Sequence, residues 1–214
     1  MKLRGIINTH EHWDHTQGNA ELVRATQCDV YAHENGKEHI PCITHAVNQG
    51  EKISLGEKAH LLVLDTPGHT MCHLSLLLIN EEGEKEAIFT GDTLFNAGVG
   101  NCTNGGDPSI LFETLRDQYL TLPDSIKIYP GHEYWENNLK FTLDREPGNL
   151  DAKEMIDQRS FQIDEKNYLV STLGLEKKVN VFFRLSSDEV KAGLENSSDE
   201  KDCFLSLRER RNHW

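Results

Sequence analysis

The sequence has few features of a disulfide-bonded or membrane-spanning protein. Its five cysteines are odd in number and no two form a CxxC pair, which indicates free thiols in a reducing compartment. No apolar stretch approaches the roughly 20 residues of a membrane-spanning helix, and the apolar run after Met1 is too short for the core of a secretory signal. We therefore expect a cytoplasmic protein that has no membrane partner.

Positive charge is also scarce. The chain has 22 Lys and Arg residues against 35 Asp and Glu residues, which gives a formal net charge of −13. This balance argues against binding to nucleic acid, and an anionic small molecule would need a local basic patch. With 214 residues, the chain can bury a substantial core as one domain or as a domain with an appendage.

The first two-thirds of the chain alternates strand-like and helix-like segments, and the remainder is dense in charge. Short apolar segments between turn residues predict strands at 3–8, 29–33, 60–65, 74–79, 87–90 and 126–129. The spacing of apolar residues predicts helices at 17–26, 108–120, 136–143, 150–158, 187–194 and 201–211. We expect an α/β layered domain over residues 1–133 and a helical domain over residues 134–214.

Metal-binding side chains crowd one turn near the start of the chain. His10, His12, Asp14 and His15 lie within six residues, directly after an apolar run. A fold seldom gathers such groups for stability alone, because their polar edges all need partners when buried. Imidazole and carboxylate ligands suit zinc, iron or manganese, and the turn has no cysteine that would indicate a closed structural zinc site.

Three later segments offer further ligands, each at the end of a predicted strand. These are His69 in T-P-G-H-T, Asp92 in G-D-T-L-F and His132 in P-G-H-E. Taken alone, an Asp in such a turn often only caps backbone amides. Because functional side chains commonly lie on loops that follow strands, we expect these three to converge with the crowded turn at one sheet edge. His73, four residues after His69, is expected to support the site or to pack in the core.

The motifs T-H-x-H-W-D-H, G-D-T-L-F and G-H-E-Y-x-x-x-N-L-K-F resemble those of the metallo-β-lactamase superfamily, and within it those of glyoxalase II, the hydroxyacylglutathione hydrolases. Segments 146–149, 171–173 and 180–184 are similar to parts of that family's helical domain. The resemblance implies an αββα sandwich followed by a C-terminal helical domain that helps to hold the substrate. Family members have strands ahead of the metal turn, so we expect a sandwich that lacks its first strands.

The resemblance also implies two divalent metal ions, for which we expect zinc, with iron or manganese as alternatives. One ion would be held by His10, His12 and His69, the other by Asp14, His15 and His132, with Asp92 bridging the two. Such a pair can activate a shared water and stabilise an oxyanion. The expected reaction is attack of metal-bound hydroxide on the thioester of S-(2-hydroxyacyl)glutathione, which releases glutathione and a 2-hydroxy acid such as D-lactate. Asp14 and Asp92 are the expected catalytic carboxylates.

Substrate binding is assigned by resemblance to Tyr134, Arg208 and Arg211. The chain departs from the family at residues 100–105, where G-N-C-T-N-G stands in place of Gly-Lys-Phe-Tyr-Glu-Gly. The loss of a cation and two aromatic residues leaves open a related acyl thioester as the substrate.

Three further functions are compatible with the same motifs. They are a lactonase, a persulfide dioxygenase with a single iron, and a truncated, weakly active homologue that has a non-catalytic role. The dioxygenase predicts one iron per chain and oxygen consumption, whereas the hydrolase predicts two metals and no oxygen requirement. The sequence predicts no particular oligomeric state.

Overall fold

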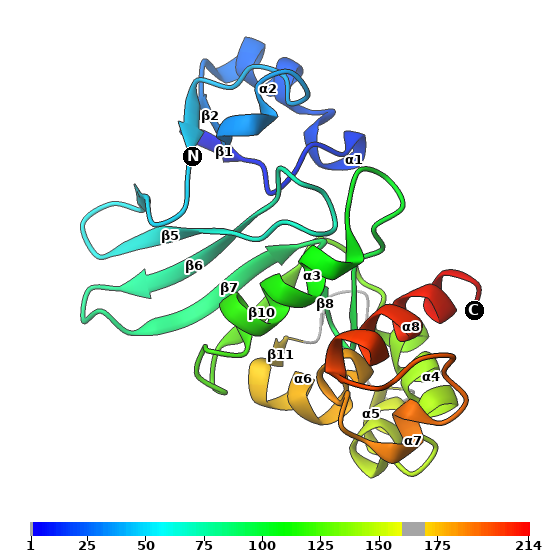
Figure 1. Cartoon of the computed structure of the whole chain (residues 1–214). Helices are drawn as coiled ribbons and strands as arrows, with labels where there is room; N and C mark the ends of the chain where they lie inside the picture. Colours follow the sequence, from blue (N-terminus) through cyan, green and yellow to red (C-terminus); the bar gives the residue numbers. More distant parts are fainter. Residues whose placement is uncertain (1, 160–169) are drawn as a thin grey trace.

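The computed structural model describes residues 2–159 and 170–214 of the chain (Figure 1). Its strands are β1 (Gly5–Ile7), β2 (Asp29–His33), β3 (His45–Val47), β4 (Lys52–Ser54), β5 (Ala59–Asp65), β6 (Leu74–Asn80), β7 (Lys85–Gly91), β8 (Leu94–Phe95), β9 (Gly98–Val99), β10 (Lys127–Pro130) and β11 (Ser171–Thr172). Its α-helices are α1 (Trp13–Thr16), α2 (Asn19–Thr26), α3 (Pro108–Thr114), α4 (Trp135–Arg145), α5 (Leu150–Arg159), α6 (Leu173–Val179), α7 (Asp188–Lys191) and α8 (Glu200–Asn212). Short 3-10 turns η1 (Glu34–Gly36) and η3 (Val181–Phe183) and a π-helical turn η2 (Leu115–Tyr119) complete the described elements.

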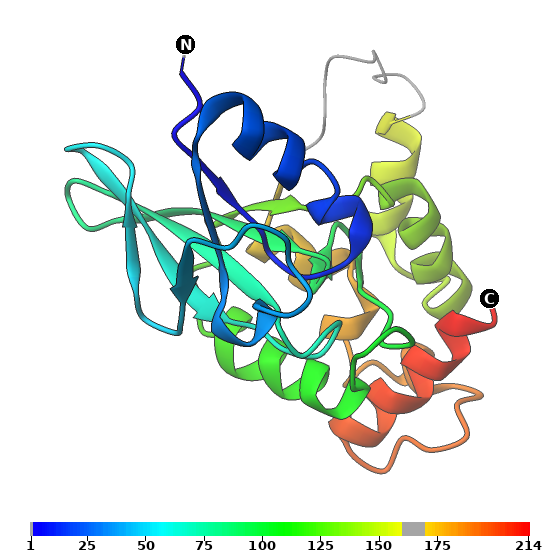
Figure 2. The ribbon, with the colours of Figure 1, turned by 90° about the horizontal axis from the view of Figure 1, so that it is seen from above.

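Two sheets form the centre of the described structure. Strands β1, β2 and β3 pair in parallel, and a larger mixed sheet has the order β11-β10-β7-β6-β5-β4. Helix α2 contacts β2 of the small sheet. Figure 2 shows α3 and α8 side by side, and both pack on the large sheet.

The alternation of side chains along β5 explains why both faces of the large sheet are covered. Leu61 and Val63 belong to the apolar cluster that faces the small sheet, whereas Leu62 and Leu64 pack against the cluster that contains α3 and α8. Successive residues of a strand point to opposite faces, so a run of apolar residues requires a layer on each side. The result is a helix–sheet–sheet–helix sandwich, which confirms the fold class expected from the sequence.

Helices α4, α5 and α6 form a second, smaller core, whereas α7 and α8 pack into the main core. Trp135 and Leu139 of α4 pack with Ala152 of α5 and Val179 of α6. This part of the chain also adds strand β11 to the edge of the large sheet, where Ser171 pairs with Ile128 of β10. The helices are therefore joined to the sandwich by backbone hydrogen bonds as well as by side-chain packing.

The predicted elements recur with shifts at their ends, while the shortest elements and the seven-residue helix α6 were missed. Strands β3, β4, β8, β9 and β11 span only two or three residues each, too few for a periodic pattern to show. The helix expected over residues 108–120 changes from α to π geometry at Leu115. Asp107 begins it by accepting hydrogen bonds from the amides of Ser109 and Ile110, at 2.7 and 3.2 Å, as an N-cap residue does.

All five cysteines lie in the described part of the chain, and all are free thiols. Among the described helices, none is both long enough and apolar enough to cross a lipid bilayer.

Candidate metal centre

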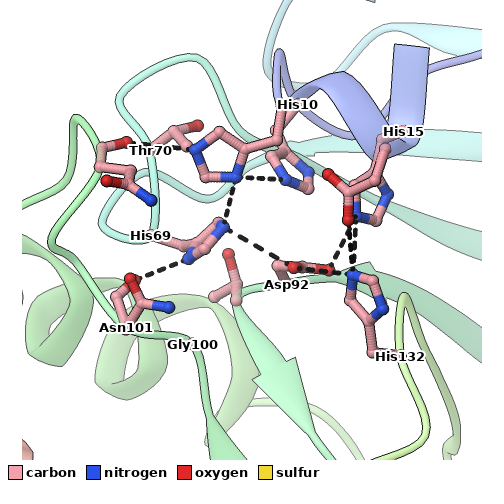
Figure 3. A network of polar contacts seen from close by, with 12 residues as sticks. His10, His15, His69, Thr70, Asp92, Gly100, Asn101 and His132 are labelled. Carbon is pink, nitrogen blue, oxygen red and sulfur yellow. Dashed lines mark hydrogen bonds and ion pairs between the residues drawn. The ribbon is translucent and has the colours of Figure 1, made fainter. Parts of the chain in front are cut away.

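The predicted ligands come together where strand ends of the two sheets meet (Figure 3). The turn from His10 to His15 follows β1, while His69, Asp92 and His132 follow β5, β7 and β10 of the large sheet. Strands β5 and β7 are each antiparallel to β6, and β10 is parallel to β7. These three strands therefore run in one direction and end at the same edge, as expected from the sequence.

Three imidazoles form the first group of converging ligand atoms. Nδ1 of His12 lies 3.1 Å from Nε2 of His10 and 3.1 Å from Nε2 of His69. His10 and His69 are buried, and His12 is partly exposed. These distances leave the three nitrogens facing a common point, which is the arrangement that a single cation needs.

The opposite nitrogens of two of these rings contact oxygen atoms. Nε2 of His12 donates to the carbonyl oxygen of Asn104 at 3.1 Å, and Nδ1 of His69 donates to that of Asn101 at 2.6 Å. Because a carbonyl oxygen can only accept, the proton of each ring lies on the outer nitrogen and the lone pair on the inner one. Such outer hydrogen bonds typically orient histidine ligands of metal ions.

The second group contains His15, His132 and Asp14. Nε2 of His15 lies 3.1 Å from Nε2 of His132, which lies 3.1 Å from Oδ2 of Asp14. The carboxylate of Asp92 lies between the two groups: Oδ1 is 3.4 Å from His15, and Oδ2 is 3.4 Å from His132 and 3.7 Å from His69. All seven predicted ligand residues are thus in one cluster.

Burial and neighbouring charges shape the electrostatics of this cluster. Burial, together with the surrounding imidazoles, lowers the pKa of His10 well below its ordinary value, and burial also lowers the pKa of His69. Burial alone would lower the pKa of His15, but the close contact with Asp92 and the charge of that carboxylate raise it overall. Neutral imidazoles with free lone pairs are suited to binding cations.

The donor set fits divalent metal ions. Oδ1 of Asp92 is buried and accepts no hydrogen bond from any residue in the described ranges. A buried carboxylate oxygen that accepts no hydrogen bond, and whose nearest cationic group is the His15 ring at 3.4 Å, is costly unless a cation satisfies it. Imidazole nitrogens and carboxylate oxygens without cysteine are ligands that zinc, iron and manganese accept.

His73 contacts the backbone of Asp92 and is fully buried. Its Nε2 accepts the backbone N–H of Asp92 at 3.1 Å, which places the ring proton on Nδ1, 2.9 Å from Oγ1 of Thr66. Oγ1 of Thr66 is hydrogen-bonded to Oγ of Ser75 at 3.0 Å, and Oγ of Ser75 is hydrogen-bonded to the hydroxyl of Tyr119 at 2.5 Å. The supporting position expected for His73 is thus part of a buried chain of hydrogen bonds, which the sequence did not predict.

Two glycines allow the ligands to approach the backbone. A Cβ atom on Gly131 would lie 2.3 Å from Oδ1 of Asp92, and one on Gly100 would lie 2.0 Å from the backbone oxygen of Asp92. A Cβ on Gly100 would also come within 2.8 Å of Nδ1 of His69. Residues without side chains are therefore required at both positions, although neither was singled out from the sequence.

A cavity of about 320 Å³ opens beside the cluster, and all three predicted substrate-binding residues line it. The ring of Tyr134 stacks on that of His132, with the ring centroids 5.2 Å apart. The Arg211 guanidinium lies over the rings of Phe141 and Trp214, at 5.2 and 4.9 Å from their centroids. Arg208 is buried, and its Nη1 donates to two backbone carbonyl groups, whereas its Nε has no hydrogen-bond partner among the described residues. The contact of these residues with a substrate stays a prediction.

Comparisons with known proteins agree with this arrangement. Residues 1–132 match the family model of the metallo-beta-lactamase superfamily, and residues 133–214 match that of the hydroxyacylglutathione hydrolase C-terminus. The whole chain is 46% identical to a hydroxyacylglutathione hydrolase of Nitrosococcus oceani, covering 82% of that protein. It is 34% identical to the cytoplasmic hydroxyacylglutathione hydrolase of Arabidopsis thaliana, again covering 82% of it.

Solved structures share the fold. The crystal structure of ETHE1 from Myxococcus xanthus aligns with a TM-score of 0.68 and 26% identity, over 99% of this chain and 71% of that one. The structure of TTHA1623 in a di-iron-bound form aligns with a TM-score of 0.53 and 26% identity, over 82% of this chain and 75% of that one. The metal-binding architecture, the two family models and the full-length identity lead to one conclusion: the chain belongs to the hydroxyacylglutathione hydrolase family of the metallo-β-lactamase superfamily.

Proposed function

We propose that this protein hydrolyses the thioester bond of S-(2-hydroxyacyl)glutathione and releases glutathione and a 2-hydroxy acid such as D-lactate. The observation that carries the proposal is the cluster of five imidazoles and two carboxylates beside a cavity lined by Tyr134 and Arg211. Relatives named hydroxyacylglutathione hydrolase match the chain over its whole length, which supports the same reaction. We also propose a cytoplasmic location, in keeping with the free cysteines and with the name of the Arabidopsis relative.

The proposed cofactor is a pair of divalent metal ions, most simply zinc, with iron or manganese as alternatives. His10, His12 and His69 would hold one ion, and Asp14, His15 and His132 the other, while Asp92 reaches both groups. The relative TTHA1623 was crystallised in a di-iron-bound form, which supports a pair of ions. When bound, such ions lower the pKa of a water molecule and stabilise the oxyanion formed at the thioester carbonyl.

The side chains of the chain itself would position the reactants. Asp14 has a half-exposed carboxylate next to His132, where it can accept a hydrogen bond from the attacking water and orient it. The backbone N–H of Asp92 donates a hydrogen bond to His73, which fixes the position of Asp92. The leaving thiolate is stable enough to depart without a strong general acid, so no further acidic group is needed for that step.

Tyr134 and Arg211 are the proposed ligands of the thiol part of the substrate. Burial and the nearby carboxylates of Asp92 and Asp14 raise the pKa of Tyr134, so its hydroxyl stays protonated at neutral pH and can donate a hydrogen bond. Arg211 would supply the positive charge for a carboxylate of glutathione. Asn101 and Thr103 also line the cavity, and they replace the lysine and tyrosine of the family pattern with shorter, neutral groups.

The decisive experiment combines metal analysis with a thioesterase assay. We expect about two metal ions per wild-type chain and hydrolysis of S-D-lactoylglutathione, and we expect Asp92→Ala to lose metal and nearly all activity. Asp117→Ala is a matched control, because Asp117 is an exposed carboxylate that contacts Arg116. A wild-type chain that holds two metals but leaves this thioester intact would contradict the substrate assignment. One iron per chain with oxygen consumption would contradict hydrolysis altogether.

A further inference from the structure

Arg208 of α8 contacts the backbone beside the metal cluster and is only 5% exposed. Its Nη1 donates to the carbonyl oxygens of Val99 and Gly100, at 3.1 and 3.3 Å. Its Nη2 donates to Oδ1 of Asn212 at 3.0 Å, and the guanidinium lies 5.4 Å from the ring centroid of Phe182. Side-chain and backbone contacts therefore hold the guanidinium group in place.

The backbone that Arg208 contacts is followed directly by the carbonyl group that contacts the predicted metal ligand His69. The next carbonyl oxygen along the chain, that of Asn101, accepts the Nδ1–H of His69 at 2.6 Å. Figure 3 shows Gly100 and Asn101 beside the ring of His69. Two consecutive carbonyl groups are thus held by two different side chains, one by Arg208 and the next by His69.

We propose that Arg208 is a positioning residue for the metal ligand His69, acting through the backbone of residues 99–101. By holding the carbonyl oxygen of Gly100, Arg208 fixes the orientation of the following peptide and thus of the carbonyl that accepts from His69. That hydrogen bond keeps the ring proton of His69 on Nδ1 and directs Nε2 toward His12, 3.1 Å away. Helix α8 therefore supports metal binding as well as lining the substrate cavity.

The energetics agree with this role. Burial lowers the pKa of Arg208 to about 10, so the group remains charged at neutral pH. The two terminal nitrogens of the buried guanidinium donate hydrogen bonds, whereas Nε has no partner in the described ranges; hydrogen bonds from a charged donor are stronger than neutral ones. Removing a direct hydrogen-bond partner of a metal ligand typically changes metal affinity by 10-fold to 100-fold, and the Asn101 carbonyl, whose position Arg208 would fix, is such a partner of His69.

Arg211 offers a matched comparison on the same helix. It lines the same cavity, but it contacts Asn138 at 3.4 Å and the rings of Phe141 and Trp214. Among the described residues, Arg211 donates no hydrogen bond to the backbone of residues 99–101. Arg211 is therefore expected to affect substrate binding without affecting the affinity for metal.

The test uses the metal-loaded protein and measures metal affinity by chelator competition, the optical spectrum after cobalt substitution, and KM and kcat separately. We expect Arg208→Gln to weaken one of the two metal sites by about 10-fold to 100-fold, to change the cobalt spectrum and to lower kcat. We expect Arg208→Lys, which keeps one charged donor, to have an intermediate effect. Arg211→Gln is expected to raise KM and leave metal affinity and spectrum unchanged.

A further variant keeps the test valid if Arg208→Gln does not fold. Asn212→Ala removes an acceptor of the guanidinium near the end of α8, and we expect a smaller weakening of the same metal site. Circular dichroism identifies the folded variants. If folded Arg208 variants bind both metals as tightly as the wild type and raise only KM, Arg208 is a substrate ligand and the inference is wrong. The inference rests on the proposed metal ligation by His69 but not on the substrate, so a wild-type chain without metal affinity would overturn both proposals.

Discussion

Glu176 of α6 provides a test of how the helical part of the chain is held to the sandwich. This carboxyl group is completely buried. Its Oε2 accepts from the backbone N–H of Ala97 at 2.7 Å and from Asn180 at 3.1 Å, and its Oε1 accepts from Ser171 at 2.5 Å. Burial outweighs these three donors and raises the pKa of Glu176 to about 7, from an ordinary value of 4.5.

The direction of the resulting pH dependence follows from the two pKa values. The folded state holds the proton more tightly than the unfolded state, so the stability that the neutral form contributes is complete below pH 4.5. That stability is lost as the pH rises from 4.5 toward 7, where the folded carboxyl also ionises. The difference between the pKa values corresponds to a loss of about 3 kcal/mol at most.

Glu176→Gln should remove this loss, because an amide of nearly the same shape stays neutral at every pH. The free energy of unfolding is measured with urea between pH 5 and pH 8 for both proteins, with Glu82→Gln, at an exposed loop position, as the control. We expect the variant to gain about 2 kcal/mol relative to wild type across this range, with little further change above it. Parallel pH profiles for Glu176→Gln and wild type would refute the reasoning.

The metal centre supports three more predictions. Gly131→Ala would place a Cβ 2.3 Å from Oδ1 of Asp92. We therefore expect weaker metal binding and at least a roughly 10-fold loss of activity, as when other groups around metal ligands are disturbed. In the control Gly18→Ala, where the nearest contact of the new Cβ is at 3.7 Å, metal binding and activity should stay at the wild-type level. His73→Phe leaves the buried N–H of Asp92 unpaired and should cost about 1–3 kcal/mol in urea unfolding; unchanged stability would contradict the supporting role. Removing the metals with a chelator should lower the melting temperature, because a ligand present at 100 times its Kd stabilises the folded state by about 2.7 kcal/mol. Equal melting temperatures with and without metal would contradict this prediction.

The sequence predicted that these seven side chains lie together, because residue type and position along the chain were both informative; their role as metal ligands stays a prediction. Histidines and aspartates at the ends of several apolar strands are seldom placed there by packing alone, and the structure brings all seven together. The surroundings of the ligands were less predictable, because they depend on contacts between distant segments. Nothing in the local sequence shows that Gly131 faces Asp92, or that Arg208 contacts Gly100 from 108 residues further along.

The same limit applies to the fold. Long apolar strands such as β5 and β6 were predicted because every residue contributes to the pattern. Strand β11 has two residues, and it exists because β10 offers an unpaired edge beside it. Pairings of this kind follow from the assembled tertiary structure and not from local propensity.

Strand β11 also bears on how the molecule unfolds. The chain matches one family model over residues 1–132 and another over residues 133–214, which suggests two exchangeable modules. Yet β11 of the second part pairs with β10 at the sheet edge of the first. In addition, Glu176 accepts a hydrogen bond from the backbone of Ala97, and Asn180 donates one to the backbone of Gly98, in the β8–β9 turn. Separating the parts would expose an open strand edge, which invites aggregation. The two matched regions should therefore melt in a single cooperative transition, and grafting the helices onto a different sandwich would require the strand edge to be transferred with them.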